Sequence, residues 1–296
     1  MKPTIIDRIK AGDVLLFDGA MGTMLFDAGL GLGECPEIMN LNRPEVIRQI
    51  AREYFEAGAD ILNTNTFGGS PMKLQQYGLD AKTVEINRAA VEAVKGVVGN
   101  SAYISGSVGP SGEILKPYGE AEPNLLLKGF RIQIEALVDT GVDLILIETM
   151  MDVNEAKIAI EAARGVSGDI PIAATMTFDH TPNGFFTVMG VNIEMAIREL
   201  PAAGADIIGA NCGIGSEKMA AIAEEFRKIT DIPLLVQPNA GLPEPDGDKF
   251  KYPENPDYMA ERIGRMLDAG VNIVGGCCGT TPDHTRVFRS VINSRQ

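Results

Sequence analysis

The stretch Ala203-Gly204-Ala205-Asp206-Ile207-Ile208-Gly209-Ala210-Asn211-Cys212-Gly213 carries the pattern that decides the fold. A helix-like segment ends in Ala-Gly, one polar residue follows, and an apolar run leads to Asn211 and Cys212. Glycine is favoured just after a helix C-terminus, and an uninterrupted apolar run is typical of a strand buried on both faces of a parallel sheet. The stretch therefore predicts a helix, a tight connection and a buried strand whose carboxyl end carries a cysteine.

The same pattern recurs along the chain, which indicates a repeated strand-and-helix architecture. Close variants occur at Glu56–Asp60, Asp139–Asp143 and Asp268–Asn272. Strands are predicted at Val14–Asp18, Ile61–Thr66, Tyr103–Val108, Leu144–Glu148, Ile172–Thr177, Ile207–Asn211, Leu234–Gln237 and Ile273–Gly276. Helical periodicity fills most intervals, at Arg43–Ala57, Ala81–Val97, Asn124–Thr140, Val153–Gly165, Ile193–Ala203, Ser216–Thr230, Asp257–Ala269 and Pro282–Arg295.

This alternation predicts an α/β fold, a (β/α)8 TIM barrel that forms a single domain over residues 1–296. An open, doubly wound sheet is the alternative. No Gly-x-Gly-x-x-Gly fingerprint with a following acidic residue favours that alternative.

Composition limits the function classes. The chain has 296 residues, of which 45% are hydrophobic, and a net charge of −14, which argues against nucleic-acid or anionic-membrane partners. Residues 1–10 contain no long apolar region, so no signal peptide is expected, and no apolar run is long enough to cross a bilayer. Four cysteines with glycine-flanked spacing do not suggest a disulfide framework. We therefore expect a cytoplasmic protein.

Three of the four cysteines lie at the predicted ends of two strands. Cys212 follows one strand, and Gly275-Gly276-Cys277-Cys278-Gly279-Thr280-Thr281-Pro282 follows another. Three thiolates and one open position form a donor set for catalytic zinc. Neighbours on a regular strand point to opposite faces, so we expect the two glycines before Cys277 to release the pair from strand geometry. The alternatives are small buried apolar residues or a strained disulfide between neighbours.

Polar or glycine-rich segments follow the predicted strands, where barrel enzymes carry their active sites. These segments are Asp18–Thr23, Asn63–Gly69, Gly106–Pro110, Glu148–Met150, Met176–Asp179, Asn211–Cys212, Gln237–Gly241 and the cysteine pair. Glu148 is expected across the rim from the cysteines, so a molecule that bridges the two would be small. The loop Gly241–Pro256 is expected to be solvated, although it could cover the site.

These segments together resemble the homocysteine S-methyltransferases. Within that family they are most similar to the N-terminal homocysteine-binding module of cobalamin-dependent methionine synthases. The matching pieces are Asp18–Thr23, Asn63–Gly68, Gly109–Gly112, Glu148–Thr149, Met176–Phe178, Asn211–Cys212, Pro238–Gly241 and Gly275–Pro282, so they run nearly end to end. The last of these pieces is the most specific.

The resemblance implies a homocysteine-binding barrel in which Cys212, Cys277 and Cys278 hold zinc and the homocysteine sulfur takes the open position. It implies that Asp18 and Glu148 lie near the substrate's amino group. It also implies that backbone amides of a turn meet the substrate's carboxylate, and this turn comprises Ala20, Met21, Gly22 and Thr23. The implied activity is transfer of a methyl group to homocysteine to give methionine.

The resemblance leaves the methyl donor open. Methylcobalamin on a separate corrinoid protein, or on further methionine synthase modules, is the first expectation, with cobalamin as a cofactor on that partner. S-methylmethionine and betaine are alternatives, because relatives that use them share the zinc motif. A non-catalytic thiol-binding subunit is a further alternative. A zinc-free barrel enzyme such as an aldolase is a weaker one, since no lysine stands at a predicted strand end for a Schiff base.

Several candidate residues also have a structural interpretation. Asp18 could serve a turn, and Glu148 could bind backbone amides at the rim. Three asparagines could contact substrate or tie rim loops together: Asn65, Asn211 and Asn239. Three further residues are not expected to be metal ligands: His180, His284 and Cys35. The two histidines are predicted at the surface or in a helix cap.

Overall fold

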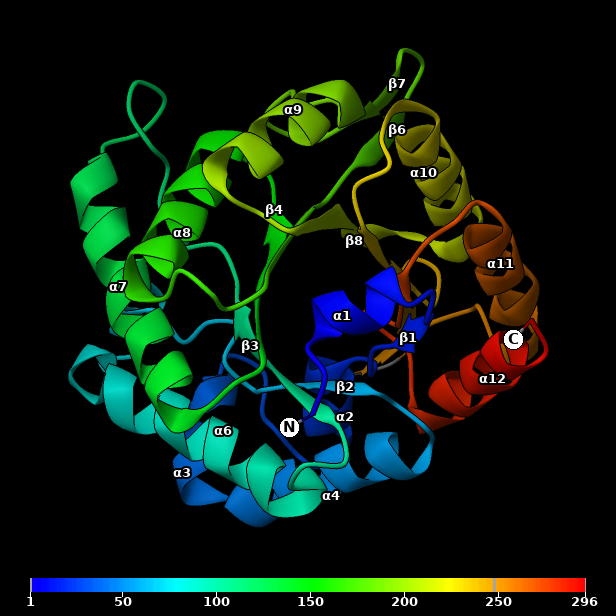
Figure 1. Cartoon of the computed structure of the whole chain (residues 1–296). Helices are drawn as coiled ribbons and strands as arrows, with labels where there is room; N and C mark the ends of the chain where they lie inside the picture. Colours follow the sequence, from blue (N-terminus) through cyan, green and yellow to red (C-terminus); the bar gives the residue numbers. More distant parts are fainter. Residues whose placement is uncertain (1, 247–248, 296) are drawn as a thin grey trace.

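The computed structural model describes residues 2–246 and 249–295, and it confirms the (β/α)8 barrel. Eight parallel strands follow the order β1-β12-β9-β8-β5-β4-β3-β2, and a parallel bridge between Phe17 and Ile61 connects the two ends of this sheet. Figure 1 shows the ring of strands inside a ring of helices. Each strand is followed by at least one helix, as the recurring sequence pattern predicts.

All eight predicted strands are present. Their bounds are β1 (Leu15–Leu16), β2 (Ile61–Asn63), β3 (Tyr103–Val108), β4 (Leu144–Met150), β5 (Ile172–Met176), β8 (Ile207–Gly215), β9 (Leu234–Asn239) and β12 (Ile273–Val274). The β4–β5 register shifts between Ile147 and Met150. The β8–β9 register shifts between Asn211 and Gly215. The two irregular stretches contain Glu148 and Cys212, so the ladder is interrupted where the candidate site residues stand.

The eight predicted helices are present within a few residues of their expected bounds: α4 (Pro44–Glu56), α6 (Thr83–Val98), α7 (Pro123–Thr140), α8 (Val153–Val166), α9 (Ile193–Ala203), α10 (Ser216–Ile229), α11 (Pro256–Asp268) and α12 (Pro282–Asn293). The glycine of the recurring pattern takes a left-handed φ after its helix, for example 101° at Gly141 and 116° at Gly204. A side chain would make this conformation costly, which explains the Ala-Gly ending.

The sequence did not indicate several shorter elements. The helical ones are α1 (Ile5–Lys10), α2 (Met21–Asp27), α3 (Met39–Asn42), α5 (Pro71–Gln75), η1 (Pro36–Ile38) and η2 (Asp80–Lys82). Two antiparallel hairpins lie outside the barrel, β6 (Asp179–Thr181) with β7 (Gly184–Phe186) and β10 (Glu244–Asp246) with β11 (Lys249–Lys251). These segments are too short for a helical or strand period to stand out.

The barrel is closed at the amino ends of its strands by α1, which lies across the opening nearest the viewer in Figure 1. Ile5 and Ile9 from α1 pack on the inward residues at the strand starts, such as Leu144 and Ile207. This plug leaves the carboxyl ends as the open end of the barrel. None of the described helices is both long and apolar enough to cross a membrane.

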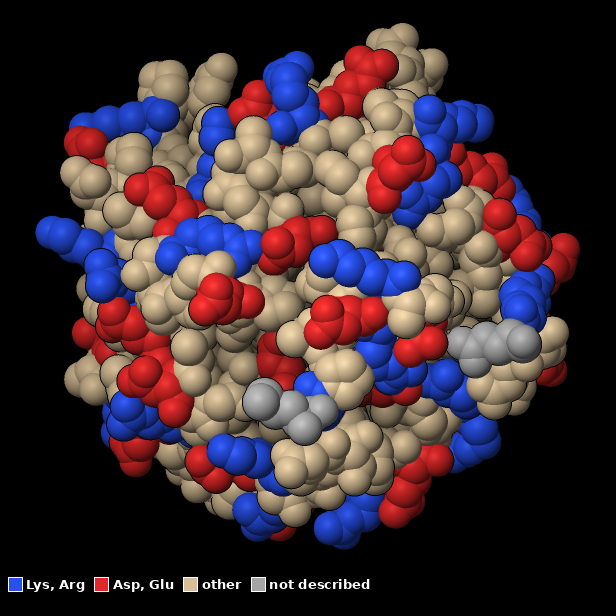
Figure 2. Space-filling model, viewed as in Figure 1, with Lys and Arg blue, Asp and Glu red and all other residues tan. Residues whose placement is uncertain are grey.

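A repeated hydrogen bond joins neighbouring strands at the amino ends. Asp143 Oδ2 accepts the amide of Ile104 at 2.9 Å, and Asp206 Oδ2 accepts the amide of Ile172 at 2.8 Å. The same contact is made twice more, by Asp60 with Leu16 and by Asn272 with Leu234. Each acceptor also contacts a basic side chain, in the order Lys2, Arg164, Arg289 and Arg227. Figure 2 shows basic and acidic side chains interleaved on this face.

Candidate functional site

The thiols of Cys212, Cys277 and Cys278 form one cluster at the carboxyl ends of the strands. Their sulfur atoms all lie within 4.8 Å of one another, and the Sγ atoms of Cys212 and Cys278 are 3.8 Å apart. Two sulfur ligands of a tetrahedral zinc ion, each about 2.3 Å from the metal, lie about 3.8 Å apart. The cluster therefore has the dimensions and the soft donor atoms that a metal ion of this kind requires.

The backbone around the cysteine pair has left strand geometry, as expected. β12 ends at Val274, and the amide of Cys277 donates to the carbonyl of Pro238 at 2.8 Å. The physical role of the glycines differs from the expected one, because neither has a left-handed φ. A Cβ at Gly276 would lie 2.2 Å from Thr280 Oγ1, and one at Gly275 would lie 2.6 Å from the Cβ of Phe17. Glycine is needed here because neighbouring chain segments approach closely.

The electrostatics of the cluster favour a cation. Hydrogen bonds from Cys277 and then from Cys278 lower the pKa of Cys212 to about 3. The hydrogen bond to Cys212 is in turn the largest cause that raises the pKa of Cys278 to about 12, and the pKa of Cys277 is also raised. One thiol thus ionises readily and opposes ionisation of its neighbours. A bound metal ion would allow all three to be thiolates.

Two buried carboxyl groups belong to this end of the barrel: Glu148 lines the same cavity as the cluster, and Asp18 directly precedes the lining residues 19–23. Asp18 is 3% exposed and Glu148 is 8% exposed. Burial raises the pKa of Asp18 to about 8, with a further contribution from the charge of Glu148. Burial also raises the pKa of Glu148. Among the residues that the structure describes, no basic residue contributes to either shift, so these carboxyl groups are suited to receive a cationic group from a ligand.

Asn63 connects the two carboxylates. Its amide donates to Asp18 Oδ2 at 2.8 Å, and its side-chain Nδ2 donates to Glu148 Oε1 at 2.9 Å. Glu148 also accepts the hydroxyl of Ser107 at 2.5 Å. The sequence analysis placed Asn63 and Ser107 at the rim but assigned them no role. The alternation of a strand could have found them, because both share the inward face with the buried residues Ile61 and Tyr103.

The cavity that contains these groups has a volume of about 390 Å³. It is lined by the cysteine cluster, by Asp18's neighbours Gly19 to Thr23, and by Pro36, Glu37, Asn63, Thr64, Asn65, Phe67, Ser107, Glu148, Thr149, Gln237 and Gly276. The Ala20–Thr23 turn of the sequence analysis is the start of α2, with Ala20 as its N-cap. First-turn amides have no partner within their helix. The amide of Ala20 donates to Thr280 Oγ1, so the amides of Met21, Gly22 and Thr23 are the candidates for a carboxylate.

The three asparagines of the sequence analysis have different surroundings. Asn65 ties rim loops together, because its Nδ2 donates to the carbonyl of Pro36 and to Asn40 Oδ1. Asn211 donates hydrogen bonds from its Nδ2 to Glu148 Oε2 and to Thr149 Oγ1. Asn239 is one of the groups that lower the pKa of Cys212, and its buried Oδ1 has no hydrogen-bond partner within residues 2–246 and 249–295.

The loop Gly241–Pro256 after β9 lies beside the cysteine cluster, in agreement with the expectation that it could cover the site. The ring of Tyr252 lies against Gly279, where an added Cβ would be 2.1 Å from its Cγ. Burial, together with the charge of Cys278, raises the pKa of Tyr252 to about 12. Residues 247 and 248 of this loop lie outside the described residues. The part that follows them covers one side of the cysteine cluster.

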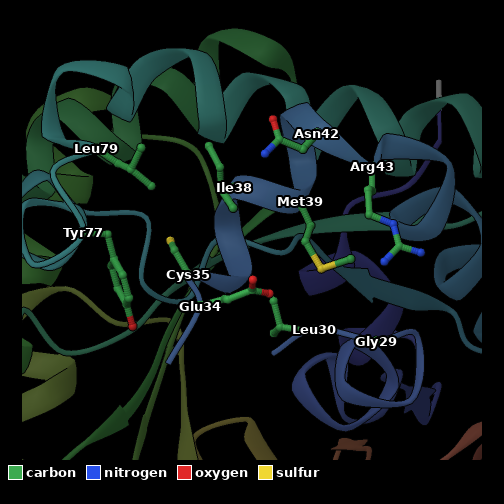
Figure 3. A pocket seen from close by; sticks show the side chains of 10 residues that line it. All are labelled: Gly29, Leu30, Glu34, Cys35, Ile38, Met39, Asn42, Arg43, Tyr77 and Leu79. Carbon is green, nitrogen blue, oxygen red and sulfur yellow. The ribbon is translucent and has the colours of Figure 1, made fainter. Parts of the chain in front are cut away.

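The other candidates are placed as expected. His180 is exposed in β6. His284 is the capping residue that the sequence allowed, because it closes a capping box with Thr281 at the start of α12, and there it is buried. Cys35 is buried in a separate apolar cluster with Leu74 and Ile86. It lines another cavity, of about 420 Å³, which shares no lining residue with the cavity of the cysteine cluster. Figure 3 shows this second cavity, with Cys35 among the η1 and α3 side chains.

Comparison with known proteins identifies related sequences and folds. Residues 15–292 match the model of the family described as homocysteine S-methyltransferase. A methionine synthase of Mycobacterium leprae is 35% identical over 306 residues, which cover 98% of this chain and 25% of the relative. One from Mycobacterium tuberculosis is 34% identical, with 94% and 24% covered. The chain thus spans about a quarter of the length of these relatives.

A solved structure has the same fold. The metallated form of the homocysteine methyltransferase MmuM from Escherichia coli superimposes with a TM-score of 0.79 at 23% identity, covering 96% of this chain and 98% of that one. The apo form of the same protein gives a TM-score of 0.74 at the same identity. At this level of identity the likeness supports the barrel fold, and the site has to be judged on its own geometry.

Proposed function

Because the chain belongs to the homocysteine S-methyltransferase family, we propose that it transfers a methyl group to the thiol of homocysteine and forms methionine at a zinc site. One observation carries this proposal. The cluster of three thiols is accompanied by a pair of buried carboxyl groups: Glu148 lines the same cavity, and Asp18 directly precedes the lining residues 19–23. Among the described residues, no basic side chain contributes to the pKa shift of either carboxyl group. The thiol cluster suits a thiol-binding metal ion, and the pair of carboxyl groups suits the ammonium group of an amino acid.

The site residues divide by the part of the substrate that they would contact. Cys212, Cys277 and Cys278 would hold zinc, and the substrate thiol would take its open position. Asp18 and Glu148 would accept hydrogen bonds from the ammonium group. The substrate's carboxylate would meet the first-turn amides of α2, which also carry the positive end of the helix dipole.

Zinc would stabilise the thiolate form of the substrate sulfur at neutral pH. A free thiol has a pKa near 8.5 and is mostly protonated at that pH. The chain's own groups would bind both ends of the amino acid and direct the sulfur toward the open rim. There the sulfur forms its bond to the methyl carbon, and the donor leaves with the electron pair of the broken bond. The thiol proton is released to solvent when the substrate binds.

The donor is proposed to be methylcobalamin, held by a separate corrinoid protein or by further modules of a methionine synthase. Two relatives are named methionine synthase, and this chain spans about a quarter of each, which supports further modules that would carry the donor. S-methylmethionine and betaine are the alternatives. The described barrel would act as one homocysteine-binding domain that presents its rim to the donor, in a cytoplasmic protein.

A donor panel tests the proposal. The protein, purified under reducing conditions and loaded with zinc, is incubated with homocysteine and one donor at a time, and methionine is measured by mass spectrometry. We expect one zinc per chain and methionine formation with methylcobalamin. Cys277→Ala should lose both. Cys35→Ala is the matched control and should keep both, because Cys35 lies in a different cluster. Homocysteine binding without transfer from any donor would favour a non-catalytic thiol-binding subunit.

A further inference from the structure

Two strand ends at the site have an uncommon backbone conformation. Among the described residues, Thr149 with φ 61° and Cys212 with φ 60° are the non-glycine residues with a left-handed φ. Each follows a candidate site residue, Glu148 or Asn211, in an interrupted strand. Such a conformation is unfavourable for a residue with a side chain and persists only where the surroundings hold it. Thr149 and Cys212 are therefore held in place by their neighbours.

The side chain of Asn211 holds both strand ends. Its Oδ1 accepts the amide of Thr149 at 2.8 Å and the hydroxyl of Thr175 at 2.7 Å. Its Nδ2 donates to Thr149 Oγ1 at 2.8 Å and to Glu148 Oε2 at 3.3 Å, and it lies 4.0 Å from Cys277 Sγ. A carboxamide has two acceptor lone pairs and two donors. All four are used on the protein, so Asn211 acts through its neighbours and has no capacity left for substrate.

This arrangement links the two ends of the proposed substrate site. Glu148 would receive the ammonium group, and Cys212 is adjacent in sequence to Asn211 and would hold the metal that receives the thiol. We infer that Asn211 and Thr149 fix the spacing between the carboxylate and the metal cluster, and that this spacing selects amino thiols by chain length. The inference rests on the proposed function, since it assigns the thiol and the ammonium group to those two places.

The selectivity follows from rigidity. Cysteine has one methylene fewer than homocysteine between its sulfur and its α-carbon, so one end of cysteine falls short by up to one C–C bond, about 1.5 Å. A site that could not adjust would lose one of the two contacts. A well-fitted pocket distinguishes one methylene by about 10- to 200-fold. A looser link would allow the ends to move together and would reduce that ratio.

Four variants test the link. Thr149→Gly removes the hydroxyl and relieves the left-handed strain, so it should fold. Asn211→Asp keeps the acceptor for the Thr149 amide but places an oxygen against Glu148. Thr149→Ser keeps the hydroxyl that Asn211 binds, so it tests whether this hydrogen bond is sufficient to preserve the ratio between the two thiols. Asn192→Asp is the matched control, because Asn192 caps α9 through its Oδ1 and aspartate caps equally well.

The measurements are zinc content, dissociation constants of homocysteine and cysteine by calorimetry, and kcat/KM for both thiols. We expect Thr149→Gly and Asn211→Asp to keep one zinc and to reduce the homocysteine-to-cysteine ratio at least about fivefold. Thr149→Ser and Asn192→Asp should retain the ratio. An unchanged ratio in the first two variants would overturn the inference, as would an equal loss in Thr149→Ser. If the wild-type protein binds thiols without methylating them, the proposed activity is refuted. The ratio of the dissociation constants of homocysteine and cysteine in the variants then tests the inference by itself. A wild type that binds neither thiol overturns both.

Discussion

The acidic residues at the two ends of the barrel differ in whether they contact basic side chains. At the amino ends, Asp60, Asp143 and Asp206 each accept a backbone amide and contact a basic side chain. At the carboxyl ends, Asp18 and Glu148 are more deeply buried, and no basic residue is among the causes of their pKa shifts. Satisfied charges at one end hold the strands together. Buried carboxyl groups without a cation at the other end reduce stability and are available to a ligand.

β4 has one acid of each kind near its two ends, Asp143 just before its first residue and Glu148 near its last, so the same chemical change can be compared at both. Glu148→Gln removes the charge proposed to bind the substrate's ammonium group. Losing one member of a buried charge pair costs roughly 2–4 kcal/mol, or about 30- to 1,000-fold. We expect kcat/KM for homocysteine to fall by that factor while the protein remains folded and zinc-loaded.

Asp143→Asn is the counterpart at the start of β4. It removes the ion pair with Lys2 but keeps an oxygen for the amide of Ile104. We expect a loss of about 0.5–1 kcal/mol in the free energy of unfolding and an unchanged kcat/KM. If Asp143→Asn impaired catalysis as much as Glu148→Gln, the contrast between the two ends would be wrong.

Replacing Arg164 should destabilise the amino ends of the strands more than Asp143→Asn does. Its guanidinium donates to the carbonyls of Gly204, Gly168 and Ile170 and pairs with Asp206. Arg164→Met removes this donor from the three carbonyls and the cation from Asp206, and we expect a loss of about 1–3 kcal/mol in unfolding free energy, measured by urea denaturation. Zinc content and kcat/KM should not change. Reduced zinc binding would show that the two ends are coupled.

The pH dependence of stability tests the role of Asp18 at the carboxyl ends of the strands. Its pKa is about 8 in the folded chain and 3.8 in the reference state. Between these values the unfolded chain has released a proton that the folded chain retains, so metal-free protein should lose stability as pH rises toward 8. Asp18→Asn should remove this part of the slope and gain about 0.5–2 kcal/mol at pH 8, while homocysteine binding weakens. An identical pH dependence in wild type and variant would show that Asp18 is not the group responsible.

Protonation of His284 should cause the smallest change in stability among these tests. Burial lowers its pKa, and its Nδ1 accepts the amide of Thr281 while its Nε2 contacts the carbonyl of Glu254. A proton on Nδ1 would break the cap, so stability should fall as pH drops below about 6.5. We expect a loss of up to about 1 kcal/mol, absent in His284→Gln, in thermal unfolding between pH 7 and 5.5. An unchanged slope in the variant would contradict this assignment.

The sequence predicted the barrel well because its repeated pattern is local. The Ala-Gly endings, the apolar runs and the amphipathic helices each reflect nearby residues, and the eight strands and eight main helices follow from them. The cysteine cluster was predictable because thiols after strands of one barrel meet at one rim. The contact between Asn63 and Glu148 joins residues 85 positions apart, and that between Asn211 and Thr149 depends on two strand irregularities. Strand alternation could have placed Asn63 on the inward face, but neither contact has a local signal. The hydrogen bonds of the Asn63 and Asn211 side chains were therefore found only in the structure.

X-ray absorption at the zinc edge, recorded with and without homocysteine, tests the central claim most directly. We predict one zinc per chain in protein purified under reducing conditions, with three sulfur ligands about 2.3 Å from the metal. Added homocysteine should raise the number of sulfur ligands to four. Protein that binds no zinc, or a shell that keeps three sulfurs when homocysteine is bound, would contradict the account.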